Sequence, residues 1–127
     1  MPIVLTTSPT DRMVIIVATG DLTLHDLANC LRQMLEAHLL SYRKIFVVSA
    51  ATPMLSDEEM DLLGGLLRRA SASGPRGAFA IVADSNRAEF AHKYAAMSGA
   101  DRPIKVFSSI HEARAWFNEE NVSPLRP

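Results

Sequence analysis

The sequence has few of the features that mark exported or membrane proteins. Cys30 is the only cysteine among its 127 residues, so the chain cannot form an internal disulfide, which suits a reducing compartment. The N-terminus has neither a basic segment nor a small-residue cleavage site, and so it does not resemble a signal peptide. No apolar run exceeds the length of residues 13–18, and a transmembrane helix needs about 20 residues. We therefore expect a cytoplasmic protein with no integral membrane association.

The sequence also lacks an excess of charge of either sign. Thirteen Lys and Arg residues stand against 14 Asp and Glu residues, which gives a formal net charge of −1. Proteins with a general affinity for nucleic acid or anionic membranes need a basic surface, so we expect neither partner. Hydrophobic residues make up 48% of the chain, and a chain of this length can build one core without metals or disulfides.

Sequence signatures of catalysis and cofactor binding are absent as well. There is no glycine-rich phosphate loop of the G-x-G-x-x-G or G-x-x-x-x-G-K-[ST] type, and no G-x-S-x-G nucleophile elbow. None of the four histidines pairs with another histidine or with Cys30 at the spacing of metal ligands. We interpret Cys30 as a buried, inert thiol, and we predict no metal, no cofactor and no catalytic residue.

What the sequence does contain is a regular alternation of short apolar strands and amphipathic helices. A short turn at residues 8–11 joins the first two strands, which predicts an antiparallel hairpin. Each later strand is followed by a helix, and such units in series require parallel strands joined by right-handed crossovers. The predicted strands are residues 3–6, 13–18, 44–48, 78–83 and 104–107, and the predicted helices begin after Thr23, after Ser56, near residue 86 and after Ser109.

These elements predict a single α/β domain of order β-β-α-β-α-β-α-β-α. Its five-stranded sheet is expected to be mostly parallel, with an antiparallel N-terminal edge strand. We place the domain at residues 1–120 and expect the tail, residues 121–127 with two prolines, to fray.

Two helix starts carry strict capping boxes. Ser56 and Glu59 open the second helix, and Ser109 and Glu112 open the last, so each serine can bond the amide three residues on while the glutamate returns to the cap. The glycine pair 64–65 weakens the second helix by about 1 kcal/mol per residue relative to alanine. We expect this pair to let another backbone approach closely.

Three stretches of the sequence resemble the SpoIIAA-like, or STAS/Sec14-like, group of small bacterial proteins. They are Val-Ala-Thr-Gly-Asp-Leu-Thr at 17–23, Ala-Ile-Val-Ala-Asp at 80–84, and the segment 106–117 with its closing Glu-Ala-Arg-Ala-Trp-Phe. The resemblance covers about residues 3 to 117. It implies a βα superhelix and a non-enzymatic role in binding protein partners or small ligands.

The sequence departs from this group at its phosphorylation motif. Members of the STAS type that antagonise anti-sigma factors carry a phosphorylatable serine in an Asp-Ser-Ser-Gly-like loop before their second helix. The matching stretch here, residues 52–59, lacks that motif, and the acidic residues after Ser56 would repel a phosphate. We interpret Ser56 as a helix cap. A receiver-domain interpretation fails too, because Ser49 stands where that fold needs an acceptor aspartate.

We predict a binding site beyond the carboxyl ends of the strands, where open α/β sheets collect their ligands. The competing interpretation is that the polar residues after the fourth strand only cap the third helix. The candidate ligand or partner residues at these ends are Ser49, Thr52, Ser56, Asp84, Ser85 and Arg87.

A second candidate surface is the far face of the sheet. The crossovers put the helices mainly on one side, yet residues 13–18 and 78–83 are apolar at nearly every position. A second copy of the chain, a lipid-like ligand, or helices that lie differently would each cover that face. We therefore predict a non-enzymatic regulatory or binding module. It would form a homodimer, or bind a protein partner or a small apolar ligand. The alternative is a small enzyme that uses the cleft at the strand ends.

Overall fold

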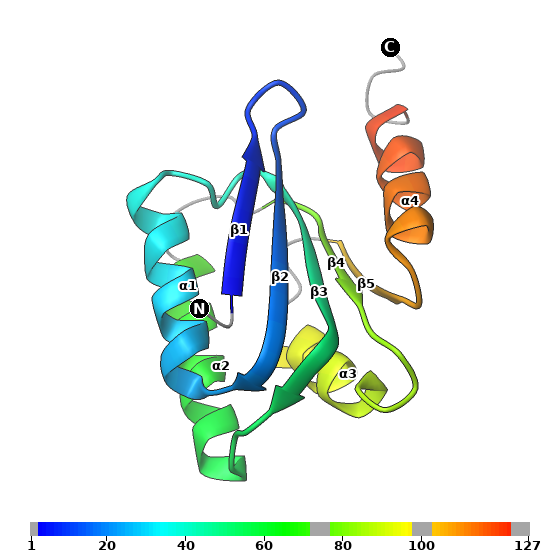
Figure 1. Ribbon diagram of the computed structural model, residues 1–127. Helices are drawn as coiled ribbons and strands as arrows, with labels where there is room; N and C mark the ends of the chain where they lie inside the picture. The colour runs from blue at the N-terminus through cyan, green and yellow to red at the C-terminus, as the bar shows by residue number, and fades with distance from the viewer. Residues whose placement is uncertain (1–2, 72–76, 98–102, 123–127) are drawn as a thin grey trace.

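The computed structural model describes residues 3–71, 77–97 and 103–122. Its five strands form one sheet in the order β1-β2-β3-β4-β5, antiparallel between β1 and β2 and parallel elsewhere (Figure 1). The predicted fold class and element order are therefore confirmed. The elements are β1 (Ile3–Ser8), β2 (Met13–Leu22), α1 (Leu24–Glu36), β3 (Arg43–Pro53), α2 (Asp57–Ser71), β4 (Phe79–Val82), α3 (Ala88–Met97), β5 (Ile104–Phe107) and α4 (Ile110–Val122).

The strands β2 and β3 run further than their apolar segments predict. β4 pairs with β3 only from Lys44 to Val47, whereas β2 and β3 stay paired as far as Leu22 and Pro53. The pairing shifts register after Val17, where β3 holds one residue more than β2. The two strands therefore project past β4 as a ribbon, and Figure 1 shows this end curving below the sheet.

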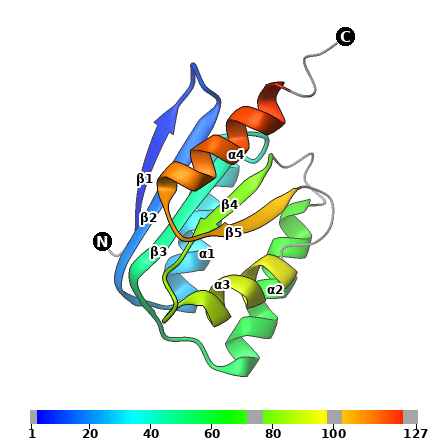
Figure 2. The same cartoon turned by 90° about the vertical axis from the view of Figure 1, so that its right-hand side faces the viewer.

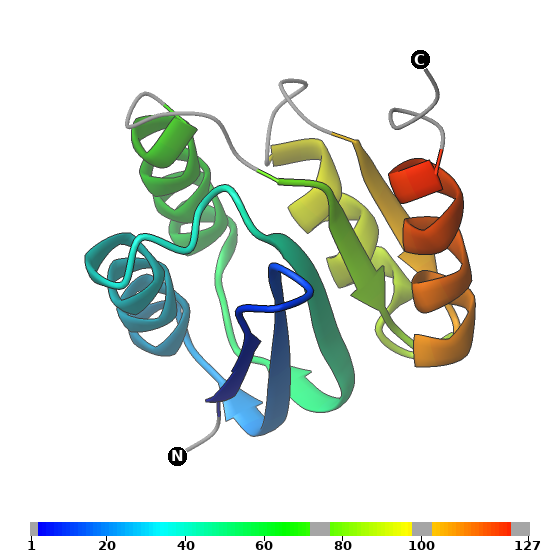
Figure 3. The same cartoon turned by 90° about the horizontal axis from the view of Figure 1, so that it is seen from above.

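One face of the sheet is covered by α1, α2 and α3. Their buried side chains meet the inward residues of β2 and β3 in a single core, which includes Ile16, Phe46, Leu63 and Tyr94. Phe46 packs edge-on against Tyr94, with ring centroids 5.4 Å apart. Figure 3 shows the three helices on the same side of the strands.

The other face is covered in part by α4. Ala113 and Phe117 are fully buried against Ile45, Ala80 and Val82 of β3 and β4. A helix that lies differently therefore covers the part of the far face that β3, β4 and β5 form, as Figures 2 and 3 show.

The part of that face formed by β1 and β2 is left more open. Val4 is 56% exposed, and Ile15 and Val17 are only half-buried. The apolar run in β2 is thus covered fully on one face only, whereas all four residues of β4 are buried.

One local expectation is wrong. Among the described residues, the atoms nearest to the glycine pair belong to side chains: a methyl group at Gly64 would lie 3.4 Å from Nη1 of Arg68 and 3.6 Å from the sulfur of Met97. α4 continues through Val122, two residues into the segment expected to fray, and residues 123–127 lie outside the described part.

Candidate binding edge at the carboxyl ends of the strands

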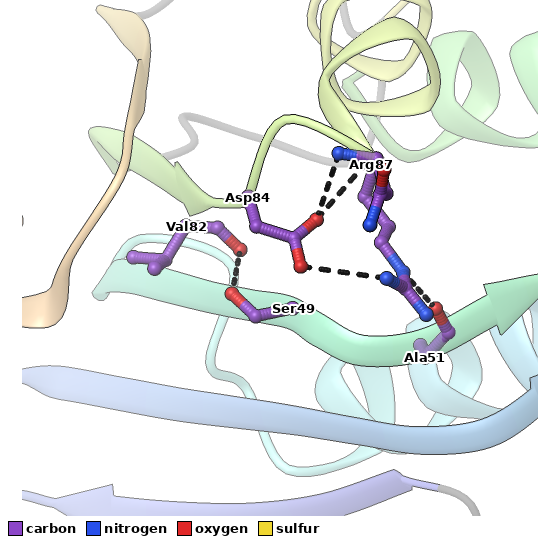
Figure 4. A network of polar contacts seen from close by, with 6 residues as sticks. Ser49, Ala51, Val82, Asp84 and Arg87 are labelled. Atoms are coloured by element: carbon purple, nitrogen blue, oxygen red, sulfur yellow. Dashed lines mark hydrogen bonds and ion pairs between the residues drawn. The ribbon is translucent and has the colours of Figure 1, made fainter.

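Three of the predicted site residues form hydrogen bonds at the end of the sheet, and together these bonds make a polar network. Ser49 lies on β3 and donates to the carbonyl oxygen of Val82 on β4 over 3.5 Å. Asp84 and Arg87 lie in the turn between β4 and α3, and the Arg87 Nε donates to the carbonyl oxygen of Ala51 over 2.7 Å. The network therefore ties the end of β3 to the turn before α3 (Figure 4).

Asp84 shapes that turn from within. Its Oδ1 accepts hydrogen bonds from the backbone amides of Asn86 and Arg87, both over 3.1 Å. Its Oδ2 lies 3.4 Å from Nη1 of Arg87, an ion pair in which the Asp84 side chain is 44% exposed. Both carboxylate oxygens thus bond within the turn, so Asp84 caps the turn that leads into α3, in line with the capping interpretation of this residue. Ser85 is exposed at the same turn.

Ser56 begins α2 as a complete capping box. The Glu59 amide donates to Oγ of Ser56 over 3.1 Å, and the Ser56 amide donates to Oε1 of Glu59 over 3.0 Å. The predicted capping role is therefore confirmed, with the hydroxyl oxygen occupied as an acceptor.

Thr52 lies at the tip of the β2–β3 ribbon, exposed and in register with Asp21. In the described part of the chain, no hydrogen bond joins Thr52 or Ser56 to the network of Ser49, Asp84 and Arg87. The strand ends thus hold one bonded pair, Asp84 and Arg87, and Ser49 bonds separately to the backbone of β4. Among the described residues, no hydrogen bond joins the hydroxyls of Thr52, Ser56 and Ser85 to these three.

Met54 is a feature of this edge that the sequence reasoning missed. It is 53% exposed, and its amide donates to the carbonyl oxygen of Leu22 over 2.8 Å, which fixes it to the end of the ribbon. The signal was a large apolar residue directly after Pro53, in a connection between a strand end and a helix cap. We call Thr52, Met54, Ser56 and Ser85 the strand-end edge.

The interior offers little room for a ligand beside Cys30. The cavity lined by Cys30, Leu27 and Met34 has a volume of about 10 Å³, near the lower limit for one water molecule. Burial raises the pKa of the Cys30 thiol from 9.0 to about 11. A thiol with so high a pKa is protonated at neutral pH and is a poor nucleophile, as the interpretation of an inert thiol requires.

The described residues contain no group of three or more His, Cys, Asp or Glu side chains arranged to hold a metal ion. Among the helices in the described ranges, none has the length and apolar character needed to cross a membrane.

Comparison with known proteins identifies the fold. The sequence matches no protein-family model, and a search of curated proteins finds no match. A solved structure of an uncharacterized protein of the DUF3478 family from Shewanella loihica PV-4, which has a SpoIIAA-like fold, is 18% identical over 90% of each chain, with a TM-score of 0.59. The unphosphorylated form of the anti-sigma factor antagonist SpoIIAA is 14% identical, over 91% of this chain and 97% of that one, with a TM-score of 0.56.

Both neighbours span nearly the whole chain, and both have the architecture that the sequence resemblance implied. The agreement extends to the features described above: one antiparallel edge pair, parallel strands in sequential order, and four helices. The chain is therefore a single α/β domain with the SpoIIAA-like fold.

Proposed function

We propose that this chain is a non-enzymatic regulatory module that binds a protein partner at its strand-end edge. The observation that carries the proposal is the exposure of Met54, a large apolar side chain, on an edge whose backbone is fixed on both sides. Methionine is enriched at the cores of protein interfaces, and a backbone that is already fixed lowers the entropic cost of binding.

The chemistry of the edge indicates what kind of partner would fit. Met54 is followed by the acidic first turn of α2, in which Asp57 is exposed. A complementary surface would offer an apolar pocket for Met54 and basic side chains beside it. The shared fold with SpoIIAA, an anti-sigma factor antagonist, supports a regulatory role exerted through a protein partner.

The alternative of an enzyme at this edge draws no support from the polar network. Asp84 would be the natural acid or base, but both of its oxygens already bond to the turn and to Arg87. A general base must be positioned to reach a substrate proton, whereas these bonds hold the carboxylate against its own turn. We therefore favour binding over catalysis here.

Site-specific photocrosslinking in the native host tests the proposal. A photoreactive residue at position 54 should capture one dominant protein, whereas the same group at position 4, also exposed and apolar, should not capture it. With that protein purified, Met54→Asp should weaken binding at least about tenfold, as expected for loss of an interface anchor, and Val4→Asp should leave it unchanged. Equal capture at both positions, or binding unaffected by Met54→Asp, would exclude this edge.

A second candidate is the binding of an apolar, lipid-like ligand on the open part of the far face. It is favoured by the exposure of Val4 beside the half-buried Ile15 and Val17. Native mass spectrometry of the purified protein should then reveal a bound mass that Val4→Asp removes. A bound mass retained by that variant, or its absence from the wild-type protein, would rule this candidate out.

A further inference from the structure

The outward side of α2 and the groove beside it lie apart from the strand-end edge. Leu62, in the middle of α2, is 61% exposed. A groove of about 250 Å³ separates α1 from α2, which lie side by side in Figures 1 and 3. Its apolar lining includes Leu31, Leu35 and Leu66, joined by Arg32 and Arg69. Pockets for whole small molecules usually measure about 300–1,000 Å³, so this groove better suits an aliphatic side chain.

Charge is divided along α2. Its first turn carries Asp57, Glu58 and Glu59, and its last turn carries Arg68 and Arg69. Residues 58, 62, 66 and 69 follow one another at helical spacing, so an acidic group, two leucines and a basic group share one side of the helix. Within the described part of the chain, neither Glu58 nor Arg69 forms an ion pair.

Because one end of this side of α2 is acidic and the other is basic, it is complementary in charge to the same side of a second, antiparallel α2. When two copies of α2 pack antiparallel about a two-fold axis, Leu62 can stand level with Leu66 of the other copy. Glu58 then falls within one residue, about 1.5 Å along the axis, of the level of Arg69 in the other copy. The arrangement repeats on both sides of the axis, as an isologous interface requires.

We propose that the chain forms a homodimer through this α1–α2 face. Leu62 of each copy occupies the groove of the other, and two Glu58–Arg69 pairs flank the leucines. Gly65 lets the helices approach, because a methyl group built there would meet only Nη2 of Arg68, at 3.8 Å. A second copy is the favoured occupant because one helix supplies both complementary charges and the apolar residues between them.

Sedimentation velocity on the full chain, from about 1 to 100 µM, tests the dimer directly. We expect a monomer–dimer equilibrium that weakens as salt rises, because the flanking pairs are exposed. Leu62→Glu should weaken dimerisation roughly a hundredfold, since the substitution occurs twice in each dimer. The matched control is Val4→Glu, which changes a similarly exposed apolar residue on the sheet and should leave the dimer intact.

Charge exchange supplies a test that does not depend on loss of an apolar residue. Glu58→Arg or Arg69→Glu alone should weaken the dimer about tenfold, whereas the double variant should return to within about threefold of wild type. Circular dichroism should show the same helix content in every variant. A wild-type monomer at all concentrations, a dimer broken by Val4→Glu but not by Leu62→Glu, or a double variant no tighter than the singles would each overturn the proposal. These measurements use the purified chain alone, so their outcome is independent of the strand-end partner.

Discussion

Gly77 holds the start of β4 against the connection between α1 and β3. Its amide donates to the carbonyl oxygen of Leu40 over 2.8 Å. Lys44, near the start of β3, also bonds this connection. Its buried Nζ donates to the carbonyl oxygens of Leu40 and Tyr42, each over 2.7 Å. These bonds keep the carbonyl groups of a tight connection satisfied where the chain packs closely.

Gly77→Ala should therefore destabilise the protein by about 1–3 kcal/mol, the usual cost of overpacking a close contact. An added Cβ would overlap the carbonyl oxygen of Tyr42, so the backbone would have to move. Urea denaturation of the variant and the wild type measures the change.

The matched control for this prediction is Gly64→Ala. A Cβ at that position would meet side-chain atoms of Arg68 and Met97 at 3.4 Å and beyond, so helix propensity should raise the stability by up to about 1 kcal/mol. If the two alanine variants had equal stability, the close approach at Gly77 would not contribute to the free energy of unfolding.

At the scale of elements, each helix begins beside a side chain that hydrogen-bonds to nearby backbone amides. At two of the helices these bonds differ from the Ser–Glu capping box described above. At α1, Asp26 completes a capping box with Thr23. At α4, the Glu112 amide donates to Oγ of Ser109, as expected. The Glu112 carboxylate, however, reaches one residue further back and accepts from the amide and the hydroxyl of Ser108, the latter over 2.6 Å. The charged end of Glu112 thus fixes the turn between β5 and α4.

The pKa of Glu112 should reveal this contact. The Ser108 hydroxyl lowers the pKa most, and the Ser108 amide and the Ser109 groups lower it further. Because the folded pKa is depressed, the contribution of Glu112 to stability is present above the ordinary glutamate pKa and is lost as pH falls through the folded value. Ser108→Ala should raise the pKa of Glu112 toward its ordinary value, as measured by NMR titration of its side-chain carboxyl.

Ser8→Ala serves as the control for this titration, because Ser8 bonds Asp11 in the distant β1–β2 turn. It should leave the titration of Glu112 unchanged. A Glu112 titration that is identical in the wild type and in Ser108→Ala would contradict the assigned hydrogen bond.

At the scale of the whole molecule, local patterns were enough to predict the order of elements but not how they share the two faces of the sheet. Ala113 and Phe117 lie at helical spacing, which predicts an apolar stripe on α4 but does not say which face it covers. The end of β2 carries the polar segment 19–21, so the pairing of β2 with β3 beyond the core could not be read from apolar runs.

In the candidate site too, roles set by residues near in sequence could be predicted, whereas roles set by distant contacts could not. Ser56 acts through a neighbour three residues away, and its role followed from spacing. Arg87 instead bonds the backbone carbonyl of Ala51, 36 residues distant, and a backbone acceptor leaves no mark on the residue types. Exposure of Met54 likewise depends on how far the β2–β3 ribbon projects past β4.

The folded core as a whole keeps the Cys30 thiol from ionising, and this links global stability to alkaline pH. Unfolding exposes the thiol to water and lets it ionise near pH 9, whereas the folded protein holds its pKa at about 11. In this window the native state binds more protons than the unfolded state, so stability falls as pH rises. Two pKa units correspond to about 2–3 kcal/mol at full effect, an order-of-magnitude figure.

Denaturant unfolding from pH 7 to pH 11 of the wild type and of Cys30→Ala isolates this contribution. Tyrosine and lysine titration affects both proteins alike, so their difference in stability reports the thiol. Cys30→Ala should be less stable at pH 7, because it leaves a space beside Leu27 and Met34 in the core. Its deficit should shrink by about 2–3 kcal/mol as pH approaches 11, since only the wild type loses the protonated thiol. Two curves that fall in parallel over this range would mean that the thiol is as accessible in the folded chain as in the unfolded one.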